Sequence, residues 1–199
     1  MQVEGNIVSL LLKTEGLLNG HFLLSSGLHS GKYLQCAKIL QYPIYATHLG
    51  ASIAERFKNQ KIDVVIGPAI GGIIIAYEVA RALGVRALFA EREEQRMTLR
   101  RGFEIKKGER VVVVEDIITT GGSVHEVVRL VQGIGGEVAG IGALIDRSEG
   151  LTIAGIKPVV LSTMKIETYD PQSCPLCRDK IPLVKPGSKQ LLGQQGARV

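Results

Sequence analysis

The chain has 199 residues, of which 45% are apolar and 22% charged, and its formal net charge is +5. This length fits one domain, or one domain with a small appendage, and the composition excludes a wholly disordered chain. The longest nearly uncharged stretch, residues 64–77, is shorter than the roughly 18 residues that a membrane span needs.

The first residues and the number of cysteines bear on where in the cell the protein is found. The first residues include Glu4 and lack the basic-then-apolar pattern of a secretory signal. Three cysteines are too few, and odd in number, for a disulfide framework. We therefore expect a cytoplasmic protein without a membrane partner.

The first 59 residues predict two helices separated by short strands. Apolar residues recur at helical spacing over 3–18, and Pro43 can occupy the first turn of a second helix that runs to about Asn59. Between these helices, residues 21–42 combine short apolar runs with turns rich in serine and glycine, which is typical of short strands.

From residue 62 onward, strands and helices alternate. The strand-like runs are 62–66, 85–90, 110–115 and 138–145, and helical spacing covers 73–83 and about 124–134. This order predicts an α/β fold, with a parallel sheet and helices on both faces. We expect a single domain over 1–185 and a flexible polar tail over 186–199.

A strongly charged connector lies between two of the expected strands. Residues 92–110 contain seven of the 24 Lys and Arg residues, with four acids among them. Charge runs are usually solvated surface, whereas loops of this length in compact domains are usually functional or disordered. From composition alone, both interpretations stay open.

The segment 111–124, VVVVEDIITTGGSV, carries the strongest chemical signal. An apolar strand ends in Glu115 and Asp116, and a turn of hydroxyl residues and glycines leads into a helix. In an open parallel sheet, ligands bind beyond the carboxyl ends of the strands. Glycines expose backbone N–H groups and the helix start adds further donors, so this turn is suited to a phosphate group.

Two acids beside a phosphate turn favour a sugar phosphate as the ligand. Carboxylates accept hydrogen bonds from vicinal hydroxyls and can hold Mg²⁺ close by. The alternative is a strand end with solvated acids and an ordinary glycine-rich connection. The two common glycine motifs for nucleotide phosphates do not occur in the sequence.

VVVVEDIITTGGS closely resembles the phosphoribosyl-diphosphate (PRPP) signature of type I phosphoribosyltransferases. Three further segments resemble the orotate phosphoribosyltransferases of that family. They are FLLSSG at 22–27, Gly67-Pro68-Ala69 at the position of the pyrophosphate loop, and ALIDR at 143–147, a strand ending in Asp-Arg.

The resemblance implies the fold and the reaction. We expect a type I phosphoribosyltransferase-like sheet with a small hood contributed by about 1–42 and the C-terminal part. The reaction would transfer the phosphoribosyl group of PRPP to orotate, giving orotidine 5'-monophosphate and pyrophosphate. Mg²⁺ would be bound mainly through PRPP, and the protein would be a homodimer with shared active sites.

The resemblance also implies the site residues. Glu115, Asp116 and Arg96 are expected to be catalytic, and Arg147 to hold the carboxylate of orotate. PRPP is expected to contact a set that runs through the signature and includes one further arginine: Arg92, Glu115, Asp116, Ile117, Ile118, Thr119, Thr120, Gly121, Gly122 and Ser123.

Two segments depart from the family pattern. The family often has a lysine where this chain has Gly71, and its mobile loop often has a second lysine and a histidine where this chain has Gln95 and Met97. In place of these missing basic residues, Arg92 and Arg96 are the first candidates for binding pyrophosphate, and Arg100 and Arg101 are the next.

The cysteine pair Cys174-Pro175-Leu176-Cys177 allows three interpretations. It could be half of a zinc site that needs two more ligands from Cys36, a histidine or a second subunit. It could also be a redox pair, or a tight turn with two reduced thiols, which is the interpretation we favour. The four histidines, at 21, 29, 48 and 125, show no metal-ligand spacing in the sequence.

Two other functions compete with the orotate enzyme. A purine or xanthine phosphoribosyltransferase would share the fold, but Arg147 and the N-terminal segment disfavour it. A non-catalytic PRPP-sensing regulator would bind nucleic acid, which the positive charge permits. The sequence has no helix-turn-helix or RNA-binding signature, and only 5% of its residues are aromatic, so we expect no nucleic-acid partner.

Overall fold

The computed structural model describes residues 6–24, 26–94 and 96–186. The chain forms two compact units. The first is built from the described residues up to 16 and from 36–165, and the second from 17–35 and from residue 166 onward. Within the described ranges, every helix is too short or too polar to cross a bilayer.

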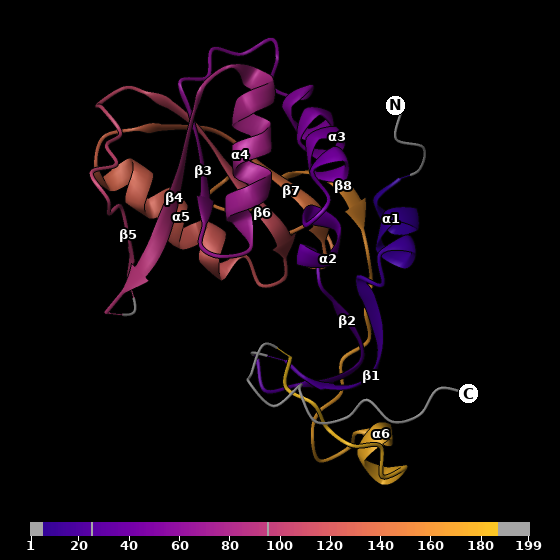
Figure 1. Cartoon of the computed structure of the whole chain (residues 1–199). Coiled ribbons are helices and arrows are strands. Elements are labelled where there is room, and N and C mark those ends of the chain that lie inside the picture. The colour runs from indigo at the N-terminus through magenta and orange to yellow at the C-terminus, as the bar shows by residue number, and fades with distance from the viewer. Residues whose placement is uncertain (1–5, 25, 95, 187–199) are drawn as a thin grey trace. The chain divides into compact units, whose positions relative to one another are not determined.

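A six-stranded sheet forms the centre of the first unit (Figure 1). Its order is β5-β4-β3-β6-β7-β8, and all neighbours are parallel except β4 and β5. The strands are β3 (Val64–Pro68), β4 (Arg86–Glu93), β5 (Arg96–Thr98), β6 (Arg110–Ile118), β7 (Glu137–Asp146) and β8 (Val159–Thr163). The predicted parallel sheet is confirmed, and β8 is a strand that the sequence analysis did not predict.

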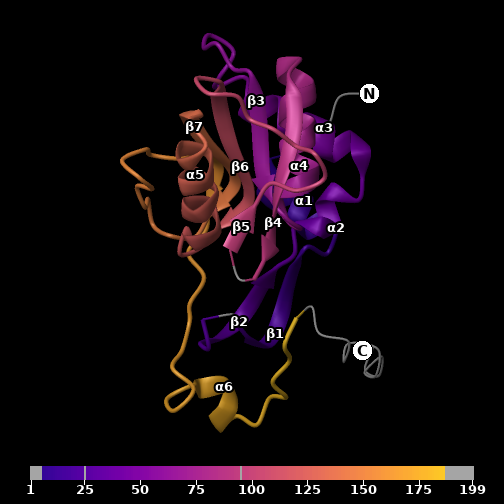
Figure 2. The same ribbon diagram turned by 90° about the vertical axis from the view of Figure 1, so that its left-hand side faces the viewer.

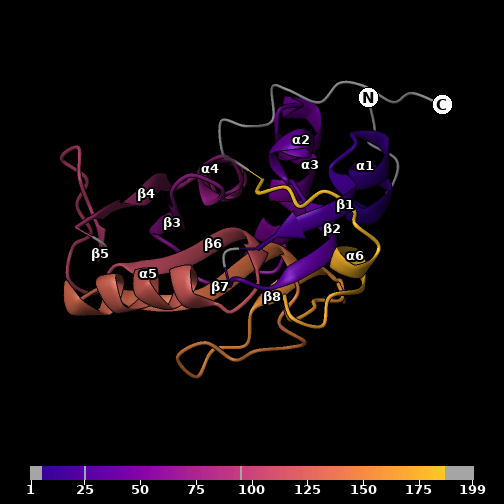
Figure 3. The same cartoon turned by 90° about the horizontal axis from the view of Figure 1, so that it is seen from below.

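Helices cover both faces of this sheet, as predicted. Figure 3 shows α5 (Gly122–Gly133) on one face and α3 (Pro43–Ala54) and α4 (Gly72–Leu83) on the other. Two shorter helices, α1 (Ile7–Lys13) and α2 (Ala37–Leu40), precede them. All four consecutive valines of β6 are buried, because a strand covered on both faces has no solvent side.

The backbone conformation confirms the predicted end of α4 and corrects the predicted end of α1. Helix α4 stops at Gly84, whose positive φ of 71° allows the Val85 N–H to reach the Ala80 carbonyl at 3.0 Å. This is the glycine-terminated end that the sequence predicts. The helix expected over 3–18 was too long: it ends at Lys13, Glu15 has a φ of 55°, and the leucines at 17 and 18 begin a strand instead.

The second unit contains a hairpin and one short helix. Strands β1 (Leu17–Leu23) and β2 (His29–Leu34) pair antiparallel, and α6 (Pro175–Arg178) lies beside them in the views of Figures 1 and 2. The hairpin brings His21 Nε2 to 2.9 Å from His29 Nδ1, although the spacing of these histidines along the chain gave no such indication.

Some predictions fall on residues that are not described. Ser25 of the 22–27 segment, Gln95 of the charged connector and all of the predicted tail except Pro186 lie outside the described residues. The single domain with a hood remains a prediction.

A glycine makes the close contact between α3 and α4 possible. A Cβ atom on Gly50 would lie 2.6 Å from the Cβ of Glu78 and 2.8 Å from its carbonyl carbon. Gly50→Ala should therefore lower the free energy of unfolding by about 1–3 kcal/mol, the usual cost of overpacking. Urea denaturation measures this. The control is Gly133→Ala on α5, where no atom lies within 4 Å of the new Cβ. Equal stability of the two variants would contradict the tight contact.

Candidate active site

The acid pair lies inside β6 and not after it. Sequence analysis ended the strand at residue 115, but pairing with β7 continues from Glu115 opposite Ala143 to Ile118 opposite Asp146. Glu115 is 8% exposed and Asp116 is half-buried. The end of a buried strand therefore holds two adjacent carboxyl groups at fixed positions.

Burial makes this pair electrostatically unfavourable. It raises the pKa of Glu115 well above its usual value, and the neighbouring charge of Asp116 raises it further. Burial also raises the pKa of Asp116. One backbone donor reaches each side chain: the Asp116 N–H lies 3.1 Å from Glu115 Oε1, and the Ile117 N–H lies 2.8 Å from Asp116 Oδ1.

These backbone donors leave acceptor capacity on both carboxylates, because each can accept about four hydrogen bonds. Vicinal hydroxyls of a sugar could use the remaining lone pairs. The same oxygen atoms suit Mg²⁺, which is commonly bound by one or two carboxylates together with the phosphates of a substrate. The donor set thus fits a magnesium ion that arrives with a phosphorylated ligand.

A tight turn after β3 approaches the acid pair. It follows Gly67 and Pro68, includes a cis peptide between Ala69 and Ile70, and places Gly71 against Asp116. A Cβ atom on Gly71 would lie 2.8–2.9 Å from the three carboxyl atoms of Asp116. In this arrangement, a side chain at position 71 would require the carboxyl group of Asp116 to move, and the glycine avoids that contact.

The turn after β6 forms a small hollow. Its volume is about 50 Å³, and it is lined by Glu115 and by residues 117–124. This is the predicted signature segment, with Asp116 absent from the lining. Since one water molecule needs about 10–15 Å³ on the same measure, the hollow has room for a group of a few heavy atoms, such as a phosphate, but not for a nucleotide.

Helix α5 starts directly at this hollow. Gly121 has a φ of 73° there, and a Cβ on it would lie 2.8 Å from Leu151 Cδ2. Within the described residues, no side chain caps the first turn of α5. Its first N–H groups and the positive end of its dipole therefore face the turn, which is the arrangement that binds phosphate groups.

Arg147 begins where β7 ends. Its N–H donates to the Ile118 carbonyl at 2.8 Å, so its backbone lies next to the last residue of β6. The side chain is half-buried. The preceding Asp146 is buried and accepts hydrogen bonds from the backbone N–H groups of Ser148 and Gly150, so it orders the turn that follows Arg147.

A larger hollow of about 460 Å³ lies beyond β7 and β8 and does not include the acid pair. Asp146 and Lys165 are among the residues that line it. We place the chemistry at the smaller hollow, because Glu115 lines it, Asp116 is the next residue along the strand, and α5 starts there. Volume alone does not supply reactive groups.

The first part of the charged connector belongs to a hairpin, and the residues from 99 to 109 form turns and irregular backbone. Strand β4 continues to Glu93, and β5 returns antiparallel to it. Met97 and Ile105 are buried in the core beside α5, and Phe103 packs edge-on against Phe89 with ring centroids 5.1 Å apart. These apolar side chains are separated by many charged residues, so the composition of the segment did not indicate that part of it is buried.

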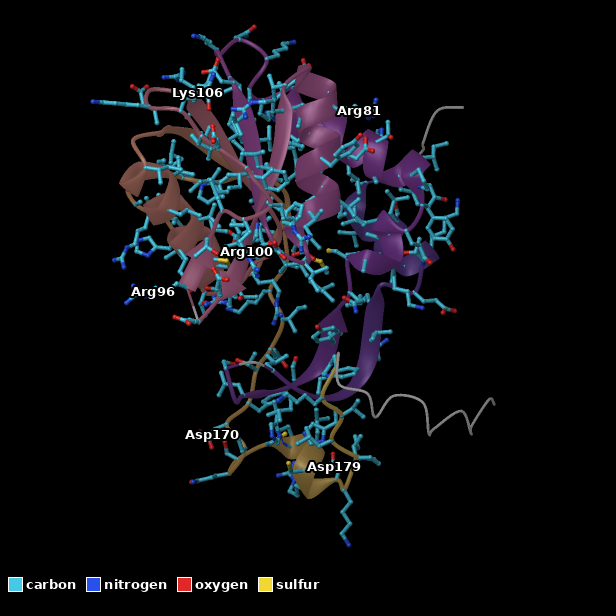
Figure 4. All side chains as sticks on the ribbon, turned by 60° about the vertical axis from the view of Figure 1, so that its left-hand side comes forward. Arg81, Arg96, Arg100, Lys106, Asp170 and Asp179 are labelled. Carbon is cyan, nitrogen blue, oxygen red and sulfur yellow. The ribbon has the colours of Figure 1, made fainter. Side chains whose placement is uncertain are left out.

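The structure separates the candidate arginines. Arg92 forms an ion pair of 2.8 Å with Glu126 of α5, Arg100 lies 3.6 Å from Glu93, and Arg101 lies 2.8 Å from Glu91. Arg96 is exposed at the start of β5 and extends away from the ribbon in Figure 4. Among the described residues, no carboxylate forms an ion pair with Arg96. Neither Arg92 nor Arg96 contacts the acid pair in this arrangement.

Sequence analysis missed one neighbour of the acid pair. Cys36 is fully buried, and its pKa is raised well above the usual value, first by burial and then by the charges of Asp116 and Glu115. Nothing local in the sequence could have placed Cys36 beside residues that lie about 80 positions away. It adds to the low polarity around the acids.

Comparison with known proteins gives consistent matches. The family model of the phosphoribosyl transferase domain matches residues 36–167. An orotate phosphoribosyltransferase of Caldanaerobacter subterraneus subsp. tengcongensis is 60% identical over 93% of this chain and 97% of its own length. One from Thermotoga maritima is 48% identical over 93% of this chain and 99% of its own.

Solved structures show the same fold. The orotate phosphoribosyltransferase of Aeropyrum pernix matches with a TM-score of 0.67 and 26% identity, over 79% of this chain and 93% of that one. The adenine phosphoribosyltransferase of Thermoanaerobacter pseudethanolicus matches with a TM-score of 0.58 and 18% identity, over 67% and 88%. The second likeness shows a shared fold alone.

The raised pKa of Glu115 has a consequence for stability. A carboxyl group whose pKa is higher in the folded state than in the unfolded state destabilises the fold once pH exceeds the unfolded value. Glu115→Gln should therefore be more stable than the wild type at pH 8, because the amide removes the cost of a buried charge. The difference should vanish as pH falls below the ordinary pKa of glutamate.

Urea denaturation of the ligand-free protein at several pH values measures this difference. Glu137→Gln is the control, because Glu137 is an exposed partner of Arg110 on the same sheet. A Glu115→Gln protein that is less stable than the wild type at pH 8 would show that the charged form is favoured in the fold.

Proposed function

The chain belongs to the phosphoribosyltransferase family, as an orotate phosphoribosyltransferase, and from this premise we propose how its residues carry out the reaction. The enzyme transfers the phosphoribosyl group of PRPP to orotate, giving orotidine 5'-monophosphate and pyrophosphate. This is a glycosyl transfer in the biosynthesis of pyrimidine nucleotides. The purine and xanthine alternatives and the non-catalytic regulator are set aside.

The observation that carries the residue assignment is the acid pair beside a phosphate-sized hollow. The 5'-phosphate of PRPP would occupy the hollow lined by 117–124, where backbone N–H groups and the start of α5 face it. Glu115 and Asp116 would then accept hydrogen bonds from the ribose hydroxyls. These contacts fix the anomeric carbon relative to the attacking nitrogen of orotate.

Negative charge develops on the leaving pyrophosphate. Mg²⁺, carried in with PRPP, would offset part of that charge, with Asp116 and Glu115 as the carboxylates next to it. The turn at 69–71 brings backbone close to the same carboxylates and adds no basic side chain. Further positive charge must therefore come from another part of the chain.

We assign that role to the tip of the β4–β5 hairpin. Its ion pair between Arg92 and Glu126 is solvent-exposed on both sides, and exposed pairs contribute only about 0–1 kcal/mol. Such a contact adds little to the anchoring that Met97 gives to the base of the hairpin. Arg96 is the basic side chain at the tip without a carboxylate partner among the described residues, and closure of the tip over PRPP would exclude water.

We further propose a homodimer in which each tip serves the neighbouring site, and a cytoplasmic location. In the structure described here, neither Arg92 nor Arg96 reaches the acid pair of its own chain. A site completed by a second subunit would account for this separation.

The activity is tested with PRPP, Mg²⁺ and a panel of acceptors: orotate, uracil, adenine, hypoxanthine and xanthine. Of these acceptors, we expect only orotate to support the release of pyrophosphate. Asp116→Asn should lower the rate by about 100-fold or more, because misplacing a reacting centre has an effect of that size. Transfer to a purine, or full activity of the Asp116→Asn protein, would contradict the assignment.

The role of Arg147 predicts a selective effect on one substrate. A guanidinium group binds a planar carboxylate through two parallel hydrogen bonds. Arg147→Ala should raise the KM for orotate by about 10–100-fold and that for PRPP far less, since the lost contact is worth about 1–3 kcal/mol. Arg129→Ala, an exposed position on α5, is the matched control. Equal changes in both KM values would make Arg147 structural.

A shared site predicts complementation between two inactive proteins. Arg96→Ala lacks the tip arginine and Asp116→Asn lacks an acid, so each should be nearly inactive alone. Mixed dimers would contain one site with both residues intact, and part of the activity should return after subunit exchange. Exchange is followed with two different affinity tags. A mixture that exchanges subunits and stays inactive would refute the shared site.

A further inference from the structure

Four potential metal ligands converge in the second unit. They are His21 on β1, His29 on β2, and Cys174 and Cys177 at the two ends of a single turn around α6. Their ligand atoms all lie within 4.8 Å of one another. This group is outside the candidate active site, and the reaction described above does not use it.

The nitrogen–sulfur distances are close to those of a tetrahedral site, whereas the two nitrogens lie closer together than a shared ion would hold them. Zinc with Zn–N of about 2.0–2.1 Å and Zn–S of about 2.3 Å requires about 3.4 Å between nitrogens and about 3.6 Å between nitrogen and sulfur. His21 Nε2 lies 3.5 Å from Cys174 Sγ and 3.8 Å from Cys177 Sγ. His29 Nδ1 lies 3.4 Å from Cys177 Sγ and 2.9 Å from His21 Nε2.

The orientation of His21 favours metal binding. Its Nδ1 lies 2.8 Å from the carbonyl oxygen of Ile181. A carbonyl can only accept, so Nδ1 carries the proton and Nε2 presents a lone pair to the two sulfurs and to His29. Metal-binding histidines usually have such a partner on the second nitrogen, because it fixes the ring and the tautomer.

The backbone holds both histidines from outside the hairpin. His29 and Tyr169 exchange two hydrogen bonds of 2.9 and 2.8 Å, and the Val184 N–H donates to the His21 carbonyl at 2.8 Å. A bulge at Gly20 and His21 interrupts the register between Asn19 and Phe22. Bulges redirect side chains, and this one brings His21 beside His29.

The second unit also lacks the apolar core that a fold of this size needs. Among its described residues, the buried large apolar side chains are Phe22 and Leu34, while His21, His29 and Ser30 are buried polar groups. Small units without a sufficient core are usually held by disulfides or by a metal. The three cysteines of the chain are free thiols in the structure.

We propose that His21, His29, Cys174 and Cys177 bind one Zn²⁺ in a closed, four-ligand structural site. The ion would link the β1–β2 hairpin to the α6 segment, which lies about 150 residues later in the chain. Each of the two segments supplies only two of the four ligands. Two thiolates and two imidazoles are a ligand set typical of zinc, and four protein ligands leave no open position for catalysis.

The first test is the metal content of the full chain, purified without a histidine tag and without added zinc. Elemental mass spectrometry should find about one zinc per chain. The Cys177→Ser and His21→Asn proteins should each retain at least tenfold less zinc than the wild type. Even the loss of a hydrogen-bond partner of a ligand lowers metal affinity about 10–100-fold. The controls Cys36→Ala and His48→Asn remove the same residue types outside the cluster and should retain the zinc.

The second test does not depend on whether the variants fold. Wild-type protein reconstituted with Co²⁺ should show the visible absorption of tetrahedral cobalt and a thiolate charge-transfer band. Thiol titration of the zinc form should find Cys174 and Cys177 protected, and a chelator should expose them and lower the Tm. A Cys174–Cys177 disulfide, or a folded protein that binds no zinc when titrated with it, would overturn the proposal. Neither test uses enzyme activity, so their outcome is separate from that of the proposed function.

Discussion

The proposed active site depends on two carboxyl groups that are held in a poorly solvated position. Glu115 and Asp116 lie in the last part of a strand whose faces are both covered, and burial raises the pKa of each. A fold gains nothing from such a pair unless a ligand with hydroxyl groups and a metal ion uses it. The site is thus organised before substrate arrives, and stability is given up for that organisation.

The surrounding chain is arranged to let backbone approach this pair. Gly71 and Gly121 stand where a Cβ would collide, with Asp116 in one case and with Leu151 in the other. Because Gly71 supplies no basic group, we expect the positive charge that offsets the leaving pyrophosphate to come from a more distant element. The β4–β5 hairpin is rich in arginine: Met97 anchors it in the core, while its charged side chains form exposed ion pairs that contribute little.

The two units are stabilised by different means. The first buries apolar side chains on both faces of its sheet, and on one face Val111 and Val113 meet the valines of α5. The second buries His21, His29 and Cys174 where an apolar core would be expected. A bound metal would replace apolar contact as the source of its stability, and it would do so without taking part in catalysis.

The sequence by itself determined the alternation of strands and helices, the end of α4 at Gly84, and the acid pair followed by a phosphate turn. These features are local, since burial and turn chemistry leave a periodic or contiguous pattern in neighbouring residues. Only the tertiary structure decided that the charged connector starts in a hairpin and places apolar side chains in the core, that Cys36 and Gly71 border the acids, and that His21 and His29 meet Cys174 and Cys177. Such contacts join residues up to about 150 positions apart, and no pattern along the chain records which distant segments will pack together.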